Sequence, residues 1–254
     1  MQFGQCHLSV IPVRADHLDS AEMVTQVLLG EVFLVTAFHN QWRKIKLAHD
    51  GYEGWIDEKQ MISISEEDFN EIQLEKKHSY AICQDAESQN RTIQLIKGSL
   101  LPYFNNQNFQ IGQENFYIDS RPYYKENINR EDISAIALEY LETPYLWGGR
   151  TPFGIDCSGF SQIVYKLAGI SLKRDASQQV QQGKKVNLLY AQTGDLAFFI
   201  NENKKIHHVG ILLADDKIIH AAGKVRIDSL DEKGIYNNQA GKYTHKLHSV
   251  NTYL

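Results

Sequence analysis

The sequence has few cysteines: Cys6, Cys83 and Cys157 in 254 residues. They are far apart and odd in number, and no two form a C-x-x-C pair, which argues against a disulfide framework and a structural zinc site. No apolar run approaches the roughly 20 residues of a membrane span. The first residues also lack the basic start and apolar run of a signal peptide. We therefore expect a cytoplasmic protein, or a secreted or periplasmic one if a leader has been removed.

A surplus of basic residues is also missing. With 26 Lys and Arg against 31 Asp and Glu, the formal net charge is −5. No Lys/Arg run is present that would bind phosphates or anionic lipids, so neither nucleic acid nor a membrane is an expected partner. The 43% hydrophobic and 22% charged shares are those of an ordinary globular protein. We expect a monomer with one large domain or two to three small ones.

Residues 1–63 read as short strands separated by polar turns. The runs HLSVIPV, EVFLVTAF and WRKIKLA carry β-branched and aromatic residues at the spacing of a small β-barrel. Their order, ending in GYEGWI at residues 51–56, resembles a bacterial SH3-like domain, whose last strand commonly carries a G-Tyr-x-Gly-Trp element. Residues 64–126 contain further strand-like runs, and we interpret them as a second, degenerate SH3-like module.

The pattern changes in residues 127–254, where longer helices precede strands. The stretch NREDISAIALEYLE begins with the cap Asn129 and acidic residues in its first turn, and Pro144 is expected to end this helix. A second helix covers CSGFSQIVYKLAG, and DLAFFI, HVGILLA and KIIHAAG then read as strands. Helices followed by an antiparallel sheet describe an α+β domain.

Cys157 stands at the start of the second of these helices. Its apolar residues recur at helical spacing, and Asp156 stands where an N-cap belongs. The unpaired N–H groups and positive dipole of a helix start favour a thiolate, so the sequence predicts a thiol pKa lowered from about 8.5. A lone cysteine is nevertheless more often a small buried hydrophobe. A nearby base is needed to decide.

His208 and His220 are the candidate bases, and their two strands read as a hairpin. A two-residue loop would put the two histidines on opposite faces of this hairpin, whereas a three-residue loop, 214–216, puts them on one face. A cysteine–histidine mechanism thus requires the odd loop. His207 points away from His208 because neighbours in a strand alternate, so only one of these two can serve.

Four stretches then occur in a family's order: PYLWGGRTPFGIDCSGFSQIVYKLAGISL, GDLAFF, HHVGILL and IIHAAG. Together they resemble the NlpC-type family of bacterial cysteine peptidases, which cut peptidoglycan peptides. The resemblance implies an α+β fold class, with a papain-like catalytic domain preceded by small all-β SH3-like barrel modules. It also implies that Cys157 is the nucleophile, His208 the general base and His220 the residue that orients the base. It implies no cofactor and no metal.

The resemblance further implies a reaction at the γ-D-glutamyl-L-diamino acid bond of cell-wall stem peptides. Cys157 attacks the γ-carbonyl, and water hydrolyses the resulting acyl-enzyme. His208 protonates the leaving amine and later activates this water. The backbone N–H of Cys157 and the hydroxyl of Tyr145 are the candidate donors to the oxyanion.

The expected specificity rests on residues carried over from a subgroup with SH3-like domains. There, an aspartate in the place of Asp175 holds the free ammonium of an N-terminal L-alanine, and a tyrosine in the place of Tyr52 walls off that end. Ser158 is expected to contact the substrate backbone, and Asp156 to do the same or to cap the helix. Such an enzyme would release L-Ala-γ-D-Glu from free stem peptides and spare the polymeric wall.

Three alternative functions stay open on the sequence. Cys157, His208 and His220 could bind zinc with an open coordination position, although no Glu stands beside them as a base. The SH3-like part could make the chain a non-catalytic wall-binding protein. The chain could also be a secreted lytic endopeptidase acting on intact wall. The diamino acid that follows D-glutamate is not predicted.

Overall fold

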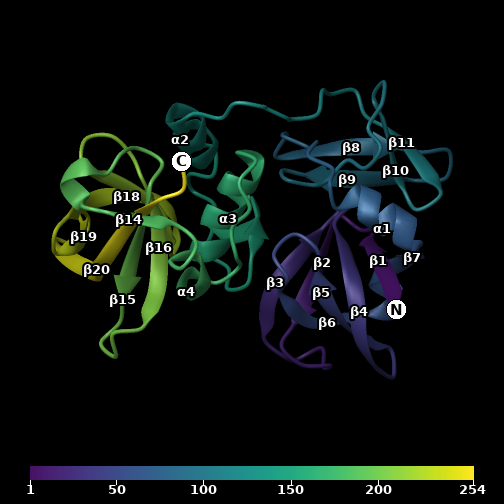
Figure 1. Ribbon diagram of the computed structural model, residues 1–254, viewed down its shortest axis with the longest axis horizontal. Coiled ribbons are helices and arrows are strands. Elements are labelled where there is room, and N and C mark those ends of the chain that lie inside the picture. The colour runs from purple at the N-terminus through teal and green to yellow at the C-terminus, as the bar shows by residue number, and fades with distance from the viewer. The chain divides into compact units, whose positions relative to one another are not determined.

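A computed structural model describes residues 1–254, which form two compact units, Met1–Tyr124 and Lys125–Leu254 (Figure 1). The protein consists mostly of strands with few helices. None of the helices combines the length and the apolar character that crossing a membrane requires.

The first unit begins with an antiparallel sheet in the order β3-β2-β6-β5-β4-β1-β7. Its elements are β1 (Gln2–Cys6), β2 (Val10–Arg14), β3 (Met23–Leu28), β4 (Val32–His39), β5 (Trp42–Leu47), β6 (Glu53–Asp57), a 3-10 turn (Glu58–Gln60) and β7 (Met61–Ile64). The inward side chains of these strands form one apolar core that includes Cys6, Ile11 and Phe33. The strand-like runs of the sequence thus lie in one sheet around a common core.

A helix and a second, smaller sheet complete this unit. They comprise α1 (Glu66–Ile72), β8 (Cys83–Glu87), β9 (Thr92–Ile96), β10 (Asn108–Ile111) and β11 (Glu114–Tyr117). The sheet order is β10-β11-β8-β9, and its core includes Leu29, from the turn that follows β3. The backbone N–H of Leu100 donates to the Leu29 carbonyl over 2.9 Å, and that of Gly112 donates to the Gln5 side chain over 2.9 Å. The segments that adjoin the second sheet are therefore hydrogen-bonded to the first sheet and to the turn after β3.

The second unit starts with α2 (Arg130–Leu138), whose capping box joins Asn129 and Asp132. The prediction that Pro144 ends this helix is wrong, because the helix stops at Leu138. The reason lies in the next segment, which pairs with a distant strand: the N–H of Glu142 donates to the carbonyl of Val225, and the N–H of Val225 donates to that of Thr143. These bonds hold residues 142 and 143 in a non-helical segment.

The main sheet of this unit closes on itself. Its order is β14-β20-β15-β16-β17-β18-β19, and β19 also pairs with β20. The strands are β14 (Lys184–Val186), β15 (Leu196–Ile200), β16 (Ile206–Leu212), β17 (Lys217–Ala222), β18 (Lys224–Asp231), β19 (Gly234–Asn237) and β20 (Lys242–Thr252). The short elements before them are β12 (Arg150–Thr151), β13 (Gly154–Ile155), α3 (Cys157–Leu167), α4 (Ala176–Gln179) and a 3-10 turn (Leu188–Tyr190). Three of these strands, β15 to β17, are the ones predicted.

Helices α3 and α4 both pack against β16 (Figure 1). Helix α3 also packs against β17. Helix α3 is buried along nearly its whole length. The packing brings the start of α3 next to the two strands that carry His208 and His220.

Candidate active site

Cys157 is the first residue of α3, as the sequence predicts. The Asp156 side chain caps the helix by accepting the Gly159 N–H over 2.7 Å. Gly159 is required here because a Cβ at this position would stand 2.2 Å from the carbonyl oxygen of Gly149. This close approach holds the first turn of the helix against the segment of Gly149. Cys157, in the same turn, is only 5% exposed.

A buried ion pair holds the same turn. The Arg174 guanidinium donates to both carboxylate oxygens of Asp156, over 3.0 and 2.5 Å, and to the Ser158 hydroxyl over 2.9 Å. Asp156 also accepts the Gly148 N–H over 2.8 Å. Such charge-assisted, two-pronged bonding is strong and directional. We infer that Asp156 holds the helix start in place, and its contact with substrate stays a prediction.

The hairpin that carries the two histidines has the odd loop that the mechanism requires. Ile211 pairs with Ile219 and Leu212 with Ile218, and the Leu213 N–H donates to the Lys217 carbonyl, which leaves residues 214–216 as the loop. The prediction of a three-residue loop is therefore confirmed.

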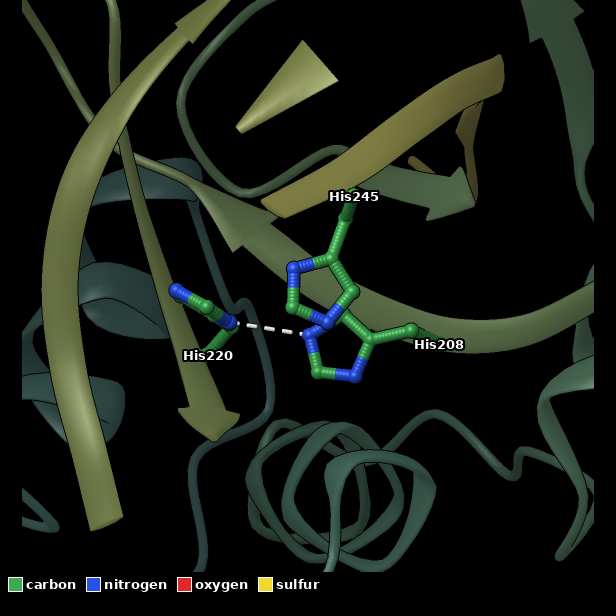
Figure 2. A group of neighbouring side chains, drawn as sticks. All are labelled: His208, His220 and His245. Atoms are coloured by element: carbon green, nitrogen blue, oxygen red, sulfur yellow. Dashed lines mark hydrogen bonds between the residues drawn. The ribbon is translucent and has the colours of Figure 1, made fainter. Parts of the chain in front are cut away.

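His208 and His220 accordingly share one face of the hairpin and are both buried. His208 Nε2 lies 2.8 Å from His220 Nδ1 (Figure 2). The β16–β17 register, continued, puts Gly210 opposite His220, and a Cβ on Gly210 would stand 2.9 Å from the His220 Cβ. The glycine therefore gives the two imidazoles the space to meet. His207, the neighbour in the chain, is exposed.

The far nitrogen of His220 reaches a carboxylate. His220 Nε2 lies 3.1 Å from Asp228 Oδ2, and the Arg226 guanidinium donates to Asp228 Oδ1 over 3.1 Å. Burial alone would raise the pKa of Asp228, but its bonds to His220 and Arg226 outweigh this and hold the pKa below its usual value. Asp228 is thus ionised and accepts the Nε2–H of His220, which leaves His220 Nδ1 to accept the Nε2–H of His208. The lone pair of His208 is then on Nδ1.

The sulfur of Cys157 lies against the strand that carries His208. It is 4.0 Å from the His207 carbonyl oxygen and accepts a hydrogen bond from the Val209 backbone. In Figure 2 the second nitrogen of the His208 ring is on the side turned away from His220. An imidazole with a lone pair on Nδ1, a second imidazole and a carboxylate therefore follow one another, and the sulfur of Cys157 lies against the strand that carries the first of them.

The predicted lowering of the Cys157 pKa is wrong. Burial raises the pKa of this thiol to about 12, and the Asp156 charge adds to the rise. Bonds from the Val209 and Ser158 backbone act in the other direction but do not offset it. Burial and the neighbouring His220 also hold the pKa of His208 well below 6.5. At neutral pH the pair therefore rests as thiol and neutral imidazole, and the thiol must lose its proton during attack.

Comparison with known proteins identifies the family to which the chain belongs. Residues 142–243 match the profile of the NlpC/P60 family, and residues 13–61 that of the bacterial dipeptidyl-peptidase Sh3 domain. A gamma-D-glutamyl-L-lysine dipeptidyl-peptidase of Bacillus subtilis is 33% identical over 214 residues, which cover 78% of this chain and 71% of the relative. The chain belongs to the NlpC/P60 family. It is a cysteine peptidase, as the sequence motifs predict.

Two further relatives cover more of this NlpC/P60 peptidase. Dipeptidyl-peptidase 6 of Lysinibacillus sphaericus is 29% identical over 242 residues, covering 84% of this chain and 86% of the relative. The crystal structure of an NlpC/P60 family protein from Bacillus cereus aligns with a TM-score of 0.83 at 20% identity and covers 99% of both chains. That second likeness concerns the fold. It includes the N-terminal part as well as the peptidase part.

Sequence reasoning missed one residue of the candidate site. The ring of His245, on β20, stacks on His208 with centroids 4.2 Å apart and planes at 26° (Figure 2). Burial lowers the pKa of His245 to about 4, so this ring too is neutral at neutral pH. The signal was hidden because the strand that carries His245 was not predicted.

The remaining predicted residues lie in different places. Tyr145 is half-buried, and burial together with the nearby Cys157 raises its pKa to about 12, so its hydroxyl keeps its proton. Asp175 is the N-cap of α4 and follows Arg174 directly. Tyr52 belongs to the other unit, where it packs against the core of the first sheet. The roles of these residues in binding substrate stay predictions.

Proposed function

We propose that this NlpC/P60 peptidase hydrolyses the γ-D-glutamyl-L-diamino acid bond of cell-wall stem peptides and releases L-Ala-γ-D-Glu. One observation carries the proposal: the 2.8 Å bond between His208 and His220 continues to Asp228, and the sulfur of Cys157 lies against the strand that carries His208. The names of the relatives, gamma-D-glutamyl-L-lysine dipeptidyl-peptidases at 33% and 28% identity, support the substrate class.

The first chemical step joins attack and proton transfer. As the sulfur of Cys157 bonds to the γ-carbonyl carbon, its proton moves to Nδ1 of His208, and the carbonyl electron pair moves to oxygen. The imidazolium so formed keeps its Nε2–H on His220, whose own Nε2–H points to Asp228. The ionised carboxylate stabilises this positive charge through two hydrogen bonds.

The second half of the reaction returns the proton. The backbone N–H of Cys157 and the Tyr145 hydroxyl hold the oxyanion until His208 protonates the leaving amine and the acyl-enzyme remains. Water then attacks the thioester while His208 takes its proton. The tetrahedral species collapses, the thiol leaves, and His208 returns the proton to it.

We assign substrate selection to Asp175 and Tyr52. A half-buried carboxylate on the cap of α4, next to the Arg174–Asp156 pair that holds the active helix, suits a free ammonium group. The Tyr52 ring would block a longer chain at that end. Ser158, in the first turn of α3, would bind the substrate backbone.

Mass spectrometry of the products tests the proposal. Tri- and tetrapeptide stems with a free N-terminal L-alanine are incubated with the enzyme, beside the same peptides acetylated at that residue, and with Cys157→Ala as control. We expect L-Ala-γ-D-Glu from the free peptides only. Equal cleavage of the acetylated peptides would contradict the role of Asp175 and Tyr52, and no cleavage of either would contradict the function.

A second candidate function has one observation in its favour. The peptidase part alone is similar to the probable endopeptidase p60 of Listeria grayi, 39% identical over 101 residues that cover 39% of this chain and 20% of the relative. An endopeptidase of the intact wall would release fragments from purified cell walls, which the selective enzyme would leave intact. The same mass spectrometry on walls separates the two.

We also propose the arrangement of the chain: an SH3-like barrel at 1–63, a second, degenerate module at 64–126 and a papain-like domain at 127–254. The two matched profiles and the closed sheet around β20 support this arrangement. Limited proteolysis of the whole protein should cut first near residue 126. We also expect the protein to be a monomer, which light scattering tests, and to lie in the cytoplasm, which cell fractionation tests.

A further inference from the structure

Three imidazoles from three strands converge in the peptidase unit. His208, His220 and His245 each offer one ring nitrogen, and these nitrogens all lie within 4.8 Å of one another. The closest two are His208 Nε2 and His220 Nδ1, 2.8 Å apart. Figure 2 shows one ring nitrogen of His245 turned toward this pair. The other, Nδ1, lies 2.9 Å from the Thr244 hydroxyl.

The outer partners of these rings are those of a metal site. Metal-binding histidines almost always use the second ring nitrogen to bond a carboxylate, carbonyl or water, which orients the ring. His220 has such a bond to Asp228, over 3.1 Å, and Asp228 is held in turn by Arg226. The Thr244 hydroxyl plays the corresponding part for His245. Two of the three rings are therefore already oriented.

We propose that His208, His220 and His245 bind a zinc-class divalent ion, and that the bound ion inhibits the peptidase. Imidazole nitrogen is a preferred ligand of Zn²⁺, Cu²⁺ and Ni²⁺. Three nitrogens at ~2.0–2.1 Å from zinc lie about 3.3 Å apart, so the rings need to shift by about an ångström. The fourth position stays open for water.

Inhibition follows from the lone pairs of His208, and it rests on the proposed function. A neutral imidazole has one nitrogen with a lone pair and one with a proton. When the ion takes the lone pair of Nε2, the proton must move to Nδ1. That nitrogen then cannot accept the proton of Cys157. The ion and the general base therefore exclude each other at this residue.

Calorimetric titration with ZnCl₂ tests the site without relying on activity. The Cys157→Ala variant should bind one Zn²⁺ per chain. Adding His245→Gln should weaken binding at least about tenfold, because it removes one of three ligands. His248→Gln is the matched control, since His248 is exposed on the same strand and should leave the affinity unchanged. Circular dichroism verifies that each variant is folded, and His245→Asn serves as a second variant.

Three results would overturn the inference: no Zn²⁺ binding by Cys157→Ala, binding that His245→Gln and His245→Asn leave unchanged, or binding only while Cys157 is present. The activity arm is separate. Zn²⁺ should inhibit hydrolysis of free stem peptides by the wild type, and EDTA should restore it. If the variant binds Zn²⁺ at the three histidines while the wild type cleaves no stem peptide, the site stands and the proposed function fails. If the wild type is active and the variant binds no Zn²⁺, the proposed function stands and the site fails.

Discussion

The two buried cysteines, one in each unit, make an instructive pair. Cys6 is fully buried in the core of the first sheet, where its thiol donates to the Leu8 carbonyl over 3.1 Å. Cys157 is 5% exposed at the start of α3. Burial raises the pKa of both thiols. A low thiol pKa therefore does not separate the nucleophile from the structural residue.

The neighbours of the two sulfurs do separate them. The thiol of Cys6 has the carbonyl oxygens of Leu8 and Val27 as hydrogen-bond partners. The charge of Glu31 raises the pKa of Cys6, just as the charge of Asp156 raises the pKa of Cys157. Beside Cys157 runs the strand of His208, an imidazole connected to an ionised carboxylate. In the proposed mechanism Cys157 acts as the nucleophile because His208 can take its proton, and burial keeps both groups neutral until substrate arrives.

Exchange of each cysteine should give the largest contrast. Cys157→Ala should lower kcat on a free stem peptide by about 10⁴-fold or more, because the attacking atom is gone. Cys6→Ala should leave kcat unchanged and lower the free energy of unfolding by about 1–2 kcal/mol. Steady-state kinetics and urea denaturation measure both. A folded but inactive Cys6→Ala protein would contradict the purely structural role of Cys6.

Removal of the base should have the next largest effect. His208→Gln should lower kcat by about 10²- to 10⁴-fold, since proton transfer then falls to solvent. His207→Gln is the matched control on the adjacent, exposed position and should stay within a few-fold of the wild type. An equal fall of kcat in the two variants would show that the assignment of His208 as the base is wrong.

A smaller effect on kcat is expected for Asp228, the last residue in the series of hydrogen bonds that joins His208 and His220 to a carboxylate. Asp228→Asn should lower kcat by about ten- to a hundredfold, because the imidazolium loses its stabilising charge. The acidic limb of the kcat/KM profile, which the depressed pKa of His208 puts below pH 6.5, should move to still lower pH. Asp231→Asn, at the exposed end of the same strand, is the control. If the acidic limb of the kcat/KM profile stays at the same pH in Asp228→Asn, the role of Asp228 is structural only.

The smallest expected effect is on stability. The folded-state pKa of His245, about 4, lies below the usual value of 6.5. The contribution of His245 to the free energy of unfolding is therefore fully present above pH 6.5. It is lost as the pH falls toward 4, because His245 takes up a proton in the unfolded chain at a higher pH than in the folded one. His245→Gln should flatten the decline of the unfolding free energy between pH 7 and 4.5, measured by urea denaturation. A parallel decline in both proteins would exclude this contribution.

Local patterns in the sequence were enough to predict the parts of the site that depend on neighbours in the chain. The cap at Asp156 places Cys157 on the first turn of α3. The hairpin of His208 and His220 was also predicted, although the sequence allowed a loop of two or three residues, and only the three-residue loop of the structure puts both histidines on one face. Both follow from helix and strand periodicity within a few residues.

Residues that reach the site from distant segments were not predictable in this way. Arg174 bonds to Asp156 across 18 positions, and His245 enters through β20, which pairs with β15 and β19 only when the sheet closes. The sign of the pKa shift at Cys157 was missed for the same reason. A helix start is visible in the sequence, whereas burial by a strand about 50 residues away depends on tertiary packing.

Labelling of the native enzyme with iodoacetamide, followed by peptide mass spectrometry, tests most directly whether Cys157 beside His208 is the nucleophile. We predict that activity falls in proportion to the label on Cys157, that the exposed Cys83 is labelled without loss of activity, and that Cys6 stays unlabelled. Full activity with Cys157 completely labelled, or inactivation while only Cys83 carries label, would contradict the account.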